Sequence, residues 1–422
     1  NAMITVNDLL PPEIAESETD PFVAAVTQFE EAAQDLQLES WISDRLKNAE
    51  REVIVNIPCA AERGEHATVA GYRVLHNAAR GPGAGPLFIT RDSSLNRVRA
   101  AAMKSTWQSA LFDLPFGGSA GALVCAPEDL SEAEMRWIVQ AYMEKMGGMV
   151  SRFSDVVIPQ CGSSCRLATW MMDACDRHAG LPDFAAVTGK PSSVWGLAAN
   201  GATASGLRIL LEEVLDEHGA TLNHQTAVVQ GFGKLGSAIG GELHGAGARV
   251  VGVADISGAL YRGEGIDMPG MEAYFQQQKM VYGYPDADAV CNADLLEAPA
   301  DLLLLAAAEN QVTRTNAGHI RARIVVEVAE GAVSGEGERI LSDRGILVIP
   351  EFLANGGGMV SAFLEWTQGL RFCRYSPAEI QQILKSRIVN CWRELRKRPG
   401  NLRREALRVA VWRVAETMRA SA

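Results

Sequence analysis

At 422 residues the chain is long enough to form two domains with sizeable hydrophobic cores. Hydrophobic residues make up 47% and charged residues 21% of the sequence, as in ordinary globular proteins, and the formal net charge of −12 argues against a nucleic-acid partner, whose phosphates would be repelled. No run approaches the ~18 apolar residues of a membrane-spanning helix, and the N-terminus lacks the basic and apolar segments of a signal peptide, so we expect a cytoplasmic protein without membrane association.

The first half of the chain predicts a sheet with accompanying helices. Residues up to about Pro21 are polar, acidic and interrupted by proline, which indicates a loose arm, and 22–46 shows the apolar spacing of a helix. Ser131 followed by Glu134 is a capping-box pattern. The remaining predictions are strands at 52–58, 69–76 and 87–90, and helices at 94–111, capped by Ser93 or Ser94, and at 131–146.

From Ala202 the pattern changes to alternating helices and strands. Such alternation implies a mostly parallel sheet. The predicted elements are a helix at 202–218 and apolar strands at 227–230, 249–254, 302–305, 324–328 and 346–349. After Asn355 an arginine-rich helical stretch runs to the C-terminus, with interruptions at Pro377 and Pro399.

A glycine motif, Gly231-x-Gly233-x-x-Gly236, stands between a predicted strand and a predicted helix, and Asp255 ends the next strand. In a dinucleotide site the first glycine makes the turn, the second admits the pyrophosphate and the third allows close packing of helix and strand. Asp255 would accept hydrogen bonds from ribose hydroxyls and repel a 2′-phosphate, which favours NAD over NADP. The alternative is an ordinary glycine-rich turn.

The stretch from Leu114 to Ala122 resembles the P-F-G-G-x-K-G-G turn of the glutamate dehydrogenase superfamily, the Glu/Leu/Phe/Val dehydrogenases. The resemblance runs from about Gly71 to Gly369. Its other landmarks are 71–77 (GYRVLHN), Gly81-Pro82, Trp107, 170–173 (WMMD), 187–191 (VTGKP), Ala202-Thr203, the Gly231 loop, 254–258 (ADISG), 309–313 (ENQVT), Asn316-Ala317, 355–358 (NGGG) and 365–368 (EWTQ).

The resemblance implies an α/β fold with two domains. Residues 1–191 with 355–422 would form a substrate and oligomerisation domain, and 192–354 a Rossmann-type NAD-binding domain. It also implies assembly into an oligomer. The cofactor would contact Thr203, Gly231, Phe232, Gly233, Lys234, Leu235, Gly236, Asp255, Ile256, Asn310 and Asn355.

The family's reaction is the reversible oxidative deamination of an amino acid, and every charged side chain that it uses on the substrate is replaced here. Carried over one by one, the three lysines fall on Ala84, Gln108 and Ala120, the proton-shuttling aspartate on Gln160 and the carboxylate-binding serine on Ala362. The asparagine near the nicotinamide falls on Glu330. Between residues 60 and 186 the only lysines are Lys104 and Lys145, so a shift in alignment cannot restore three of them.

Other residues allow two interpretations each. Lys104 lies one helical turn before Gln108 and is either a relocated cation or, as we favour, a surface lysine. Arg152 and Arg166 bind an anion or form structural ion pairs, and we favour the ion pair for Arg166. Eight scattered cysteines fit free thiols, so Cys161 and Cys165 are expected to be inert rather than a metal or redox pair, and we expect no metal site. His76 and His178 are expected to pack or cap.

Two functions remain open from the sequence. One is a catalytically silent or regulatory subunit of the family, which binds NAD or a metabolite and associates with itself or with an active paralogue. The other is an active NAD-dependent dehydrogenase with a less anionic amino- or keto-acid substrate. In either case the alanines and glutamines at the substituted positions predict a pocket for a neutral or partly apolar small molecule.

Overall fold

The computed structural model describes residues 20–60, 66–160, 165–180, 182–197 and 199–422. The chain divides into two compact units, a terminal unit (residues 19–199 and 358–422) and a central unit (residues 200–357). The sequence placed the crossings at 191/192 and 354/355. The segment just before the first crossing is hydrogen-bonded to the terminal unit, where the backbone N–H of Leu197 donates to Glu365 Oε2 at 2.9 Å.

The terminal unit is built on a five-stranded sheet in the order β1-β2-β4-β3-β5. β1 and β2 are antiparallel, as are β2 and β4, whereas β3 runs parallel to both β4 and β5. The residue pattern predicts β1 to β3 but neither β4 nor β5. The strands are β1 (Arg51–Ala60), β2 (His66–Asn77), β3 (Gly83–Thr90), β4 (Gly118–Val124) and β5 (Asp155–Gln160).

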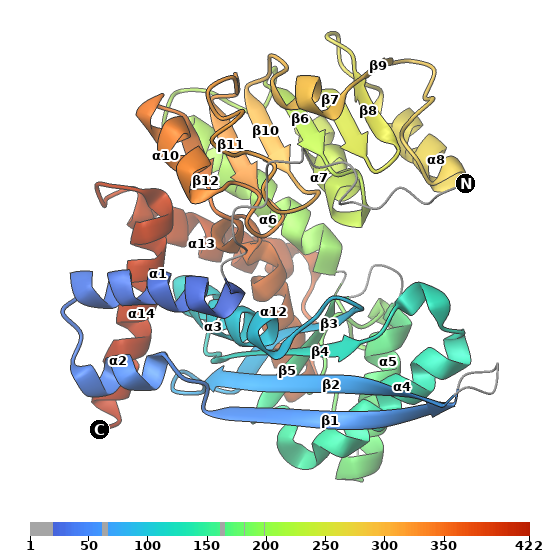
Figure 1. Ribbon diagram of the computed structural model, residues 1–422, viewed down its shortest axis with the longest axis vertical. Coiled ribbons are helices and arrows are strands. Elements are labelled where there is room, and N and C mark those ends of the chain that lie inside the picture. The colour runs from blue at the N-terminus through green and yellow to red at the C-terminus, as the bar shows by residue number, and fades with distance from the viewer. Residues whose placement is uncertain (1–19, 61–65, 161–164, 181, 198) are drawn as a thin grey trace. The chain divides into compact units, whose positions relative to one another are not determined.

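Helices cover both faces of this sheet (Figure 1). On one face, residues of α4 (Glu132–Met146) and α5 (Cys165–Ala179) form a core with strand residues such as Leu87, Leu123 and Val157. On the other face, α3 (Leu95–Leu111) packs Val98 and Ala102 against the sheet. The expected helix caps are confirmed: Ser94 Oγ accepts from a backbone N–H of α3, and Ser131 and Glu134 form the capping box of α4.

The helix expected over 22–46 is two helices, α1 (Pro21–Asp35) and α2 (Ser40–Leu46). The chain turns between them because Gln37 adopts a left-handed conformation with φ of +49°. Three C-terminal helices complete the unit, and Pro377 occupies the first position of the middle one, where a missing N–H costs nothing. They are α12 (Gly356–Arg371), α13 (Pro377–Leu395) and α14 (Leu402–Ala420). Short 3-10 turns are η2 (Pro127–Asp129), η3 (Gly147–Met149) and η4 (Ser192–Val194).

The central unit has a seven-stranded sheet in the order β12-β11-β10-β6-β7-β8-β9. The five strands from β12 to β7 are parallel, and β8 and β9 extend the sheet antiparallel. This arrangement confirms the predicted two-domain α/β fold. The strands are β6 (Thr226–Gln230), β7 (Arg249–Asp255), β8 (Gly258–Tyr261), β9 (Asp288–Val290), β10 (Leu302–Leu305), β11 (Ile324–Glu327) and β12 (Leu347–Ile349).

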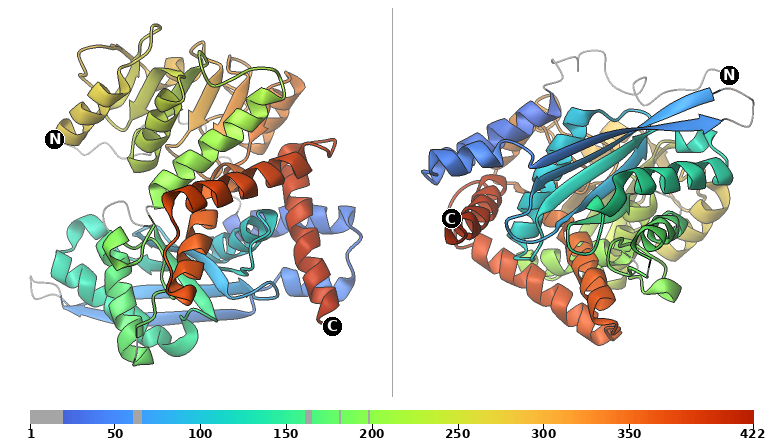
Figure 2. Two further views of the ribbon diagram at one scale, coloured as in Figure 1. Left: turned by 180° about the vertical axis from the view of Figure 1, so that it is seen from behind. Right: turned by 90° about the horizontal axis from the view of Figure 1, so that it is seen from below.

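Helices lie on both faces of the central sheet as well. Residues of α9 and α10 join one hydrophobic core with Val228, Leu303 and Val325. Figures 1 and 2 show α6 and α7 on the other face. The helices are α6 (Ala199–Asp216), α7 (Lys234–Gly245), α8 (Met268–Gln278), α9 (Asn292–Leu296), α10 (Gly335–Asp343) and α11 (Glu351–Ala354).

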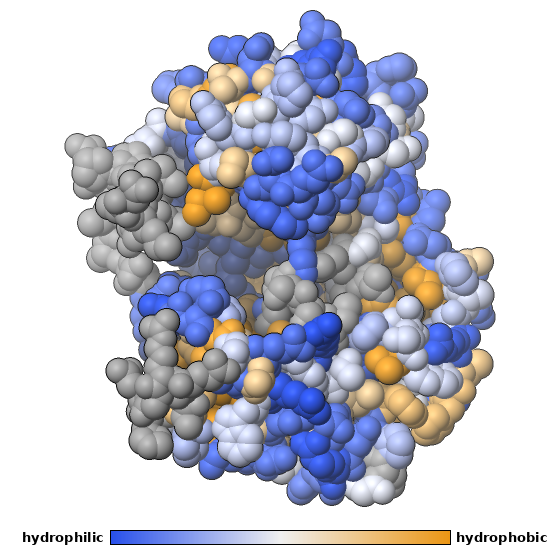
Figure 3. Space-filling model, turned by 90° about the vertical axis from the view of Figure 1, so that its right-hand side faces the viewer, coloured by the Kyte–Doolittle hydropathy of each residue, from blue (hydrophilic) through white to orange (hydrophobic). Residues whose placement is uncertain are grey.

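The molecular surface is largely polar in the view of Figure 3, where apolar residues occur in small groups among hydrophilic ones. Within the described residues, none of the helices is both long and apolar enough to span a membrane.

Candidate functional site

The three glycines of the Gly231 loop have three different local environments. Gly231 has φ of +96°, and a Cβ there would lie 2.5 Å from backbone atoms of Ala306 and Ala307. A Cβ on Gly236 would lie 1.8 Å from the carbonyl oxygen of Gly231. A Cβ on Gly233, by contrast, would meet no atom within 4 Å. The loop therefore combines an obligatory turn, a close backbone contact and one open position at the N-cap of α7.

Asp255 ends β7 with its carboxylate held in place by backbone donors. Oδ1 accepts from the backbone N–H and the hydroxyl of Ser257, at 2.7 and 2.5 Å, and Oδ2 accepts from the backbone N–H of Val281 at 3.1 Å. A carboxylate accepts about four hydrogen bonds, so one acceptor position remains for a ribose hydroxyl. Beside it, Ile256, Met280 and Tyr282 are 74%, 42% and 53% exposed and offer apolar surface next to this carboxylate.

Two buried side-chain oxygens at the carboxyl ends of the central strands have no hydrogen-bond partner among the described residues. They are Gln230 Oε1, at the end of β6, and Asn355 Oδ1. The amide nitrogens of both side chains are engaged: Gln230 donates to Gln311 Oε1 at 2.6 Å, and Asn355 donates to the carbonyl oxygen of Val328 at 2.9 Å. An unpaired buried acceptor is costly, so both oxygens suit a ligand that brings a donor.

The other residues expected at the cofactor lie around the same strand ends. Phe232 is buried with its ring edge-on to Phe275, Lys234 is exposed and Leu235 is half-buried. Asn310 has φ of +56° and donates its backbone N–H to Gly331, and Thr203 lies in α6. The open Gly233 position, the Asp255 carboxylate and the two unpaired acceptors together fit a dinucleotide.

The positions expected to line the substrate pocket lie in the terminal unit. Ala84 on β3 and Ala120 on β4 are fully buried, and Ala362 on α12 is 5% exposed. Gln108 is half-buried on α3, and Gln160 is exposed at the end of β5. None of these five side chains can serve as a general acid or base, because alanine and glutamine do not titrate.

Ala120, which occupies the position of the family's catalytic lysine, is part of a hydrophobic core. It belongs to a cluster with Val74 of the neighbouring strand and with Val98 and Ala102 of α3. The preceding Gly118 lies so close to α3 that a Cβ would be 2.1 Å from the backbone nitrogen of Thr106. The helix and the strand are therefore packed tightly at the point where a lysine side chain would have to pass.

The turn before β4 also meets α12. The ring of Phe116 lies 6.1 Å from that of Phe363 and 5.0 Å from that of Trp366, between ring centroids. The residue before Phe363 is Ala362, so these contacts bring the turn that leads to Ala120 and the helix that carries Ala362 to one side of the sheet.

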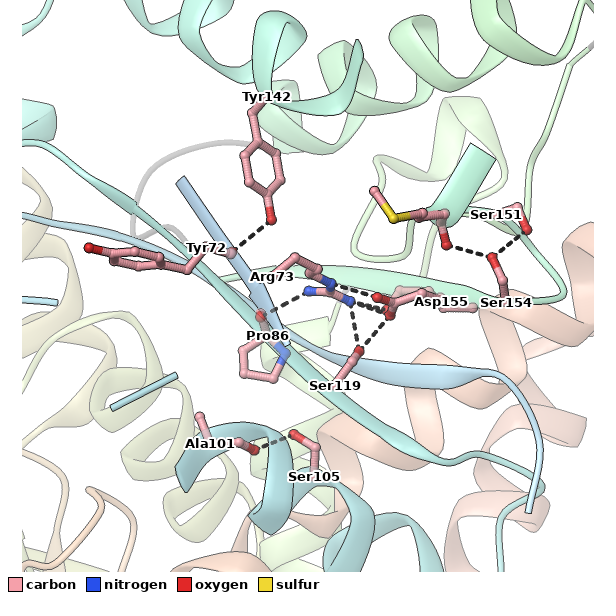
Figure 4. Close-up of polar contacts among 12 residues, drawn as sticks. Tyr72, Arg73, Pro86, Ala101, Ser105, Ser119, Tyr142, Ser151, Ser154 and Asp155 are labelled. Atoms are coloured by element: carbon pink, nitrogen blue, oxygen red, sulfur yellow. Dashed lines mark hydrogen bonds and ion pairs between the residues drawn. The ribbon is translucent and has the colours of Figure 1, made fainter. Parts of the chain in front are cut away.

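A buried polar network that the sequence analysis did not identify lies on the other face of the same strands (Figure 4). Arg73 of β2 donates to both carboxylate oxygens of Asp155, at 2.8 and 2.5 Å, and to Ser119 Oγ at 2.7 Å. Ser119 in turn donates to Asp155 at 2.6 Å. Both charged side chains are nearly inaccessible and satisfied within the chain, so we assign them a structural role beneath the site. Arg73 and Asp155 are 82 residues apart in the sequence, so a short sequence pattern does not predict that they pair.

The V-T-G-K-P landmark contains a buried polar group that is unsatisfied among the described residues. Thr188, in the V-T-G-K-P landmark, is fully buried, and its hydroxyl has no hydrogen-bond partner among the described residues. Two positions later Lys190 is also buried, but it forms an ion pair of 2.6 Å with Glu365 of α12. The lysine is therefore structural, whereas the Thr188 hydroxyl suits a neutral polar ligand.

Two of the three cations considered as replacements form ion pairs within the terminal unit. Arg152 pairs with Asp183 at 3.0 Å, and Arg166 forms an exposed pair with Glu132, which is the structural ion pair that we favoured. Lys104, for which we favour the interpretation as a surface lysine, is half-buried on α3. It lies one helical turn before Gln108, on the same side of α3.

The histidines and cysteines that the structure describes supply no further site. His76 is buried, with its ring nitrogens 2.8 Å from Thr106 Oγ1 and 2.9 Å from the carbonyl oxygen of Leu46, and burial lowers its pKa to about 4. It packs as expected. Cys161 and the side chain of Cys165 lie outside the described residues. In the part of the chain that the structure describes, no group of three or more His, Cys, Asp or Glu side chains could hold a metal ion.

Comparison with known proteins decides the family. The family model described as Glutamate/Leucine/Phenylalanine/Valine dehydrogenase matches residues 196–422, and the model of the family's dimerisation domain matches residues 49–177. The chain belongs to the Glu/Leu/Phe/Val dehydrogenase family. Members of this family are NAD(P)-dependent oxidoreductases.

Individual relatives match over nearly the whole chain. Glutamate dehydrogenase A2 of Halobacterium salinarum is 31% identical over 94% of this chain and 96% of its own length. The cryptic catabolic NAD-specific glutamate dehydrogenase of Bacillus subtilis is 33% identical over 96% of each chain. Among solved structures, the leucine-bound form of the hetero-hexameric glutamate dehydrogenase of Thermus thermophilus superposes with a TM-score of 0.91 at 29% identity, over 98% of each chain.

Proposed function

We propose that this protein is a catalytically silent, regulatory subunit of the glutamate dehydrogenase family, one that binds a dinucleotide and assembles with a catalytically active paralogue. The observation that carries the proposal is the environment of Ala120. At the position that aligns with the catalytic lysine, a small apolar side chain completes the core between β4 and α3.

The loss of acid–base chemistry extends beyond that position. Gln160 stands where the resemblance places the proton-shuttling aspartate, and Ala84, Gln108 and Ala362 stand where it places substrate-binding groups. Removing one acid–base group lowers a rate by roughly 10²–10⁴, and removing a buried charged contact costs roughly 2–5 kcal/mol. The combined loss is expected to abolish glutamate turnover.

The nucleotide site, by contrast, keeps its features. The N–H groups at the start of α7 and the open Gly233 would hold the pyrophosphate, and Asp255 would bind the adenosine ribose. Asn355 and Asn310 would lie at the nicotinamide end with Thr203, and Glu330 aligns nearby. A bound nicotinamide would supply hydride chemistry, but these residues on their own only bind and orient it. The negative charge of Asp255 disfavours the 2′-phosphate of NADP, so we propose NAD.

One structural relative supports the proposed assembly of this chain with a catalytically active paralogue. The solved structure reported above is a hetero-hexamer, an oligomer built from different chains. A silent subunit can remain useful in such an assembly, since it can bind an effector and change the activity of its neighbours without turning over substrate itself.

Assembly is tested by expressing this chain together with the glutamate dehydrogenase of the same host. Native mass spectrometry of the purified complex is expected to show oligomers that contain both chains, and NADH assays are expected to show activity that differs from that of the paralogue alone. If only homo-oligomers of each chain form, the regulatory proposal is wrong.

A second candidate is an active dehydrogenase with a less anionic substrate. The half-buried Lys104 and the unpaired hydroxyl of Thr188 favour it. For both candidate functions, thermal-shift screening of glutamate, 2-oxoglutarate, leucine and neutral amides shows which class of ligand the pocket binds. We expect neutral ligands to stabilise the protein, because a dicarboxylate would be desolvated without cationic partners at positions 84, 120 and 362. Stabilisation by dicarboxylates alone, abolished in Lys104→Ala, would instead show a relocated cation.

A further inference from the structure

The central unit contains a pocket of about 480 Å³ that belongs neither to the glycine loop nor to the substrate positions. It is lined by Leu302, Ile324 and Leu347, the first residues of β10, β11 and β12. The Gly231 loop follows the carboxyl end of β6. The pocket lies at the opposite, amino ends of the strands in the same sheet, away from the arrowheads in Figure 1. Dinucleotides bind at carboxyl ends of parallel strands, which leaves this amino-end pocket for another ligand.

The pocket is large enough for a small molecule and mostly aliphatic. Its volume lies in the range of roughly 300–1,000 Å³ that is usual for ligand sites. Nine of its sixteen lining residues are aliphatic. Val214 and Leu215, near the end of α6, and Ile320 are buried, so the apolar wall is part of the core.

The charges in the lining are unbalanced. Three arginines and one aspartate line the pocket. Arg323 forms an ion pair with Asp301 at 2.8 Å, and Asp301 also accepts two hydrogen bonds from Thr226. This pair is neutral and its carboxylate is satisfied, so the aspartate does not offset the other two arginines.

Among the described residues, neither of those two guanidinium groups lies within ion-pair distance of an acid, although Arg321 also borders a second pocket that includes Asp294 and Glu297. Arg344 donates to the carbonyl oxygens of Ala317 and Ile320, at 2.5 and 2.7 Å, which fixes its position without neutralising its charge. Neither Arg344 nor Arg321 forms an ion pair with any residue that the structure describes. In a chain of net charge −12, the largely aliphatic lining of this pocket therefore includes two exposed arginines without an ion-pair partner among the described residues.

We propose that this pocket binds a small carboxylate with an apolar body. The planar fork of arginine matches a carboxylate with two parallel hydrogen bonds, and the aliphatic wall would cover the rest of the molecule. The assignment of such a ligand as an effector rests on the proposed regulatory function. The binding itself does not, and it is measured without any turnover.

The test uses octanoate as the probe and isothermal titration calorimetry of the purified full-length chain. We expect saturable binding of one octanoate per chain, with much weaker binding of acetate, which lacks the apolar body, and of 1-octanol, which lacks the charge. Arg344→Gln and Arg321→Gln are each expected to weaken octanoate about tenfold, the effect of losing one charge-assisted hydrogen bond. Arg339→Gln is the matched control, because Arg339 is an exposed arginine of α10 outside the pocket.

Three results would overturn the proposal: no saturable octanoate binding, equal binding of octanol, or unchanged affinity in both pocket variants. Arg344→Gln removes hydrogen bonds to a loop and can therefore destabilise the protein, which thermal unfolding would reveal. In that event Arg321→Gln decides, because the Arg321 side chain holds no backbone group among the described residues. Failure here would leave NADH binding and mixed assembly intact, so the two proposals fail separately.

Discussion

Gly236 faces the carbonyl oxygen of Gly231 so closely that a Cβ on Gly236 would lie 1.8 Å from that oxygen. Backbone atoms on both sides of the contact cannot move without disturbing the start of α7. The first turn of this helix is where the pyrophosphate of a dinucleotide would be held.

Gly236→Ala is therefore expected to distort the loop, destabilise the central unit by about 1–3 kcal/mol and weaken NADH at least about tenfold. Fluorescence titration with NADH and thermal unfolding measure the two effects. Gly241→Ala, in the same helix but with nothing within 4 Å of its Cβ, is the control and should retain both properties. Equal behaviour of the two variants would contradict the packing role of Gly236.

Gly233→Ala is expected to weaken NADH binding without changing the stability of the protein. Gly233 has φ of −74°, which alanine adopts readily, and its Cβ would meet no atom within 4 Å. Stability should therefore change by less than about 0.5 kcal/mol. NADH affinity should nevertheless fall at least about tenfold, because the methyl group would project to where the pyrophosphate approaches. Unchanged NADH binding would remove this loop from the nucleotide site.

Ala120→Lys is expected to destabilise the protein without creating glutamate dehydrogenase activity. The new ammonium group would be buried among Val74, Val98 and Ala102, and an unpaired buried charge costs several kcal/mol. The melting temperature and NADH production from L-glutamate are the measurements, with Ala273→Lys at an exposed site of α8 as the control. A clear gain of activity would show that this one position limits catalysis.

His76 is expected to make stability depend on pH. Burial lowers its pKa from 6.5 to about 4, so the unfolded chain takes up a proton at a higher pH than the folded chain. The contribution is present above pH 6.5 and is lost as the pH falls toward 4, by up to about 3 kcal/mol. Urea unfolding at pH 7, 6 and 5 should show a flatter profile in His76→Gln, since glutamine keeps hydrogen-bonding capacity but does not titrate. If the stability of His76→Gln and that of the unmodified protein change with pH to the same extent, His76 does not cause the pH dependence.

Local rules predicted the parts of the fold that depend on neighbouring residues. The caps at Ser94 and Ser131 involve partners three residues away, the backbone N–H of Arg97 and both the backbone and the side chain of Glu134, and the Gly231 turn follows from its spacing. β4 was not predicted because Gly118–Val124 consists mainly of small residues, which form a strand only between β2 and β3. The α1–α2 break was missed because nothing at Gln37 signals its left-handed backbone.

In the candidate site, too, short sequence patterns predicted individual residues but not their contacts with distant segments. The substituted residues could be named from the sequence, but not the packing that closes around Ala120, because Val74 and Val98 come from a separate strand and helix. Asp255 was assigned by its place at the end of β7, whereas the hydrogen bond that holds its carboxylate comes from Val281, 26 residues later. Contacts between distant segments depend on the three-dimensional arrangement, which short sequence patterns do not encode.

The most direct test of the account is the steady-state turnover of the purified chain on its own, with L-glutamate and NAD and with 2-oxoglutarate, ammonia and NADH. Ala84, Gln108, Ala120 and Gln160 leave the aligned positions without acid–base or charged groups, so we expect no turnover above background. The same preparation should still bind NADH, which shows that it is folded. A turnover number of about 1 s⁻¹ or more, the lower end of ordinary enzymes, would contradict the central claim.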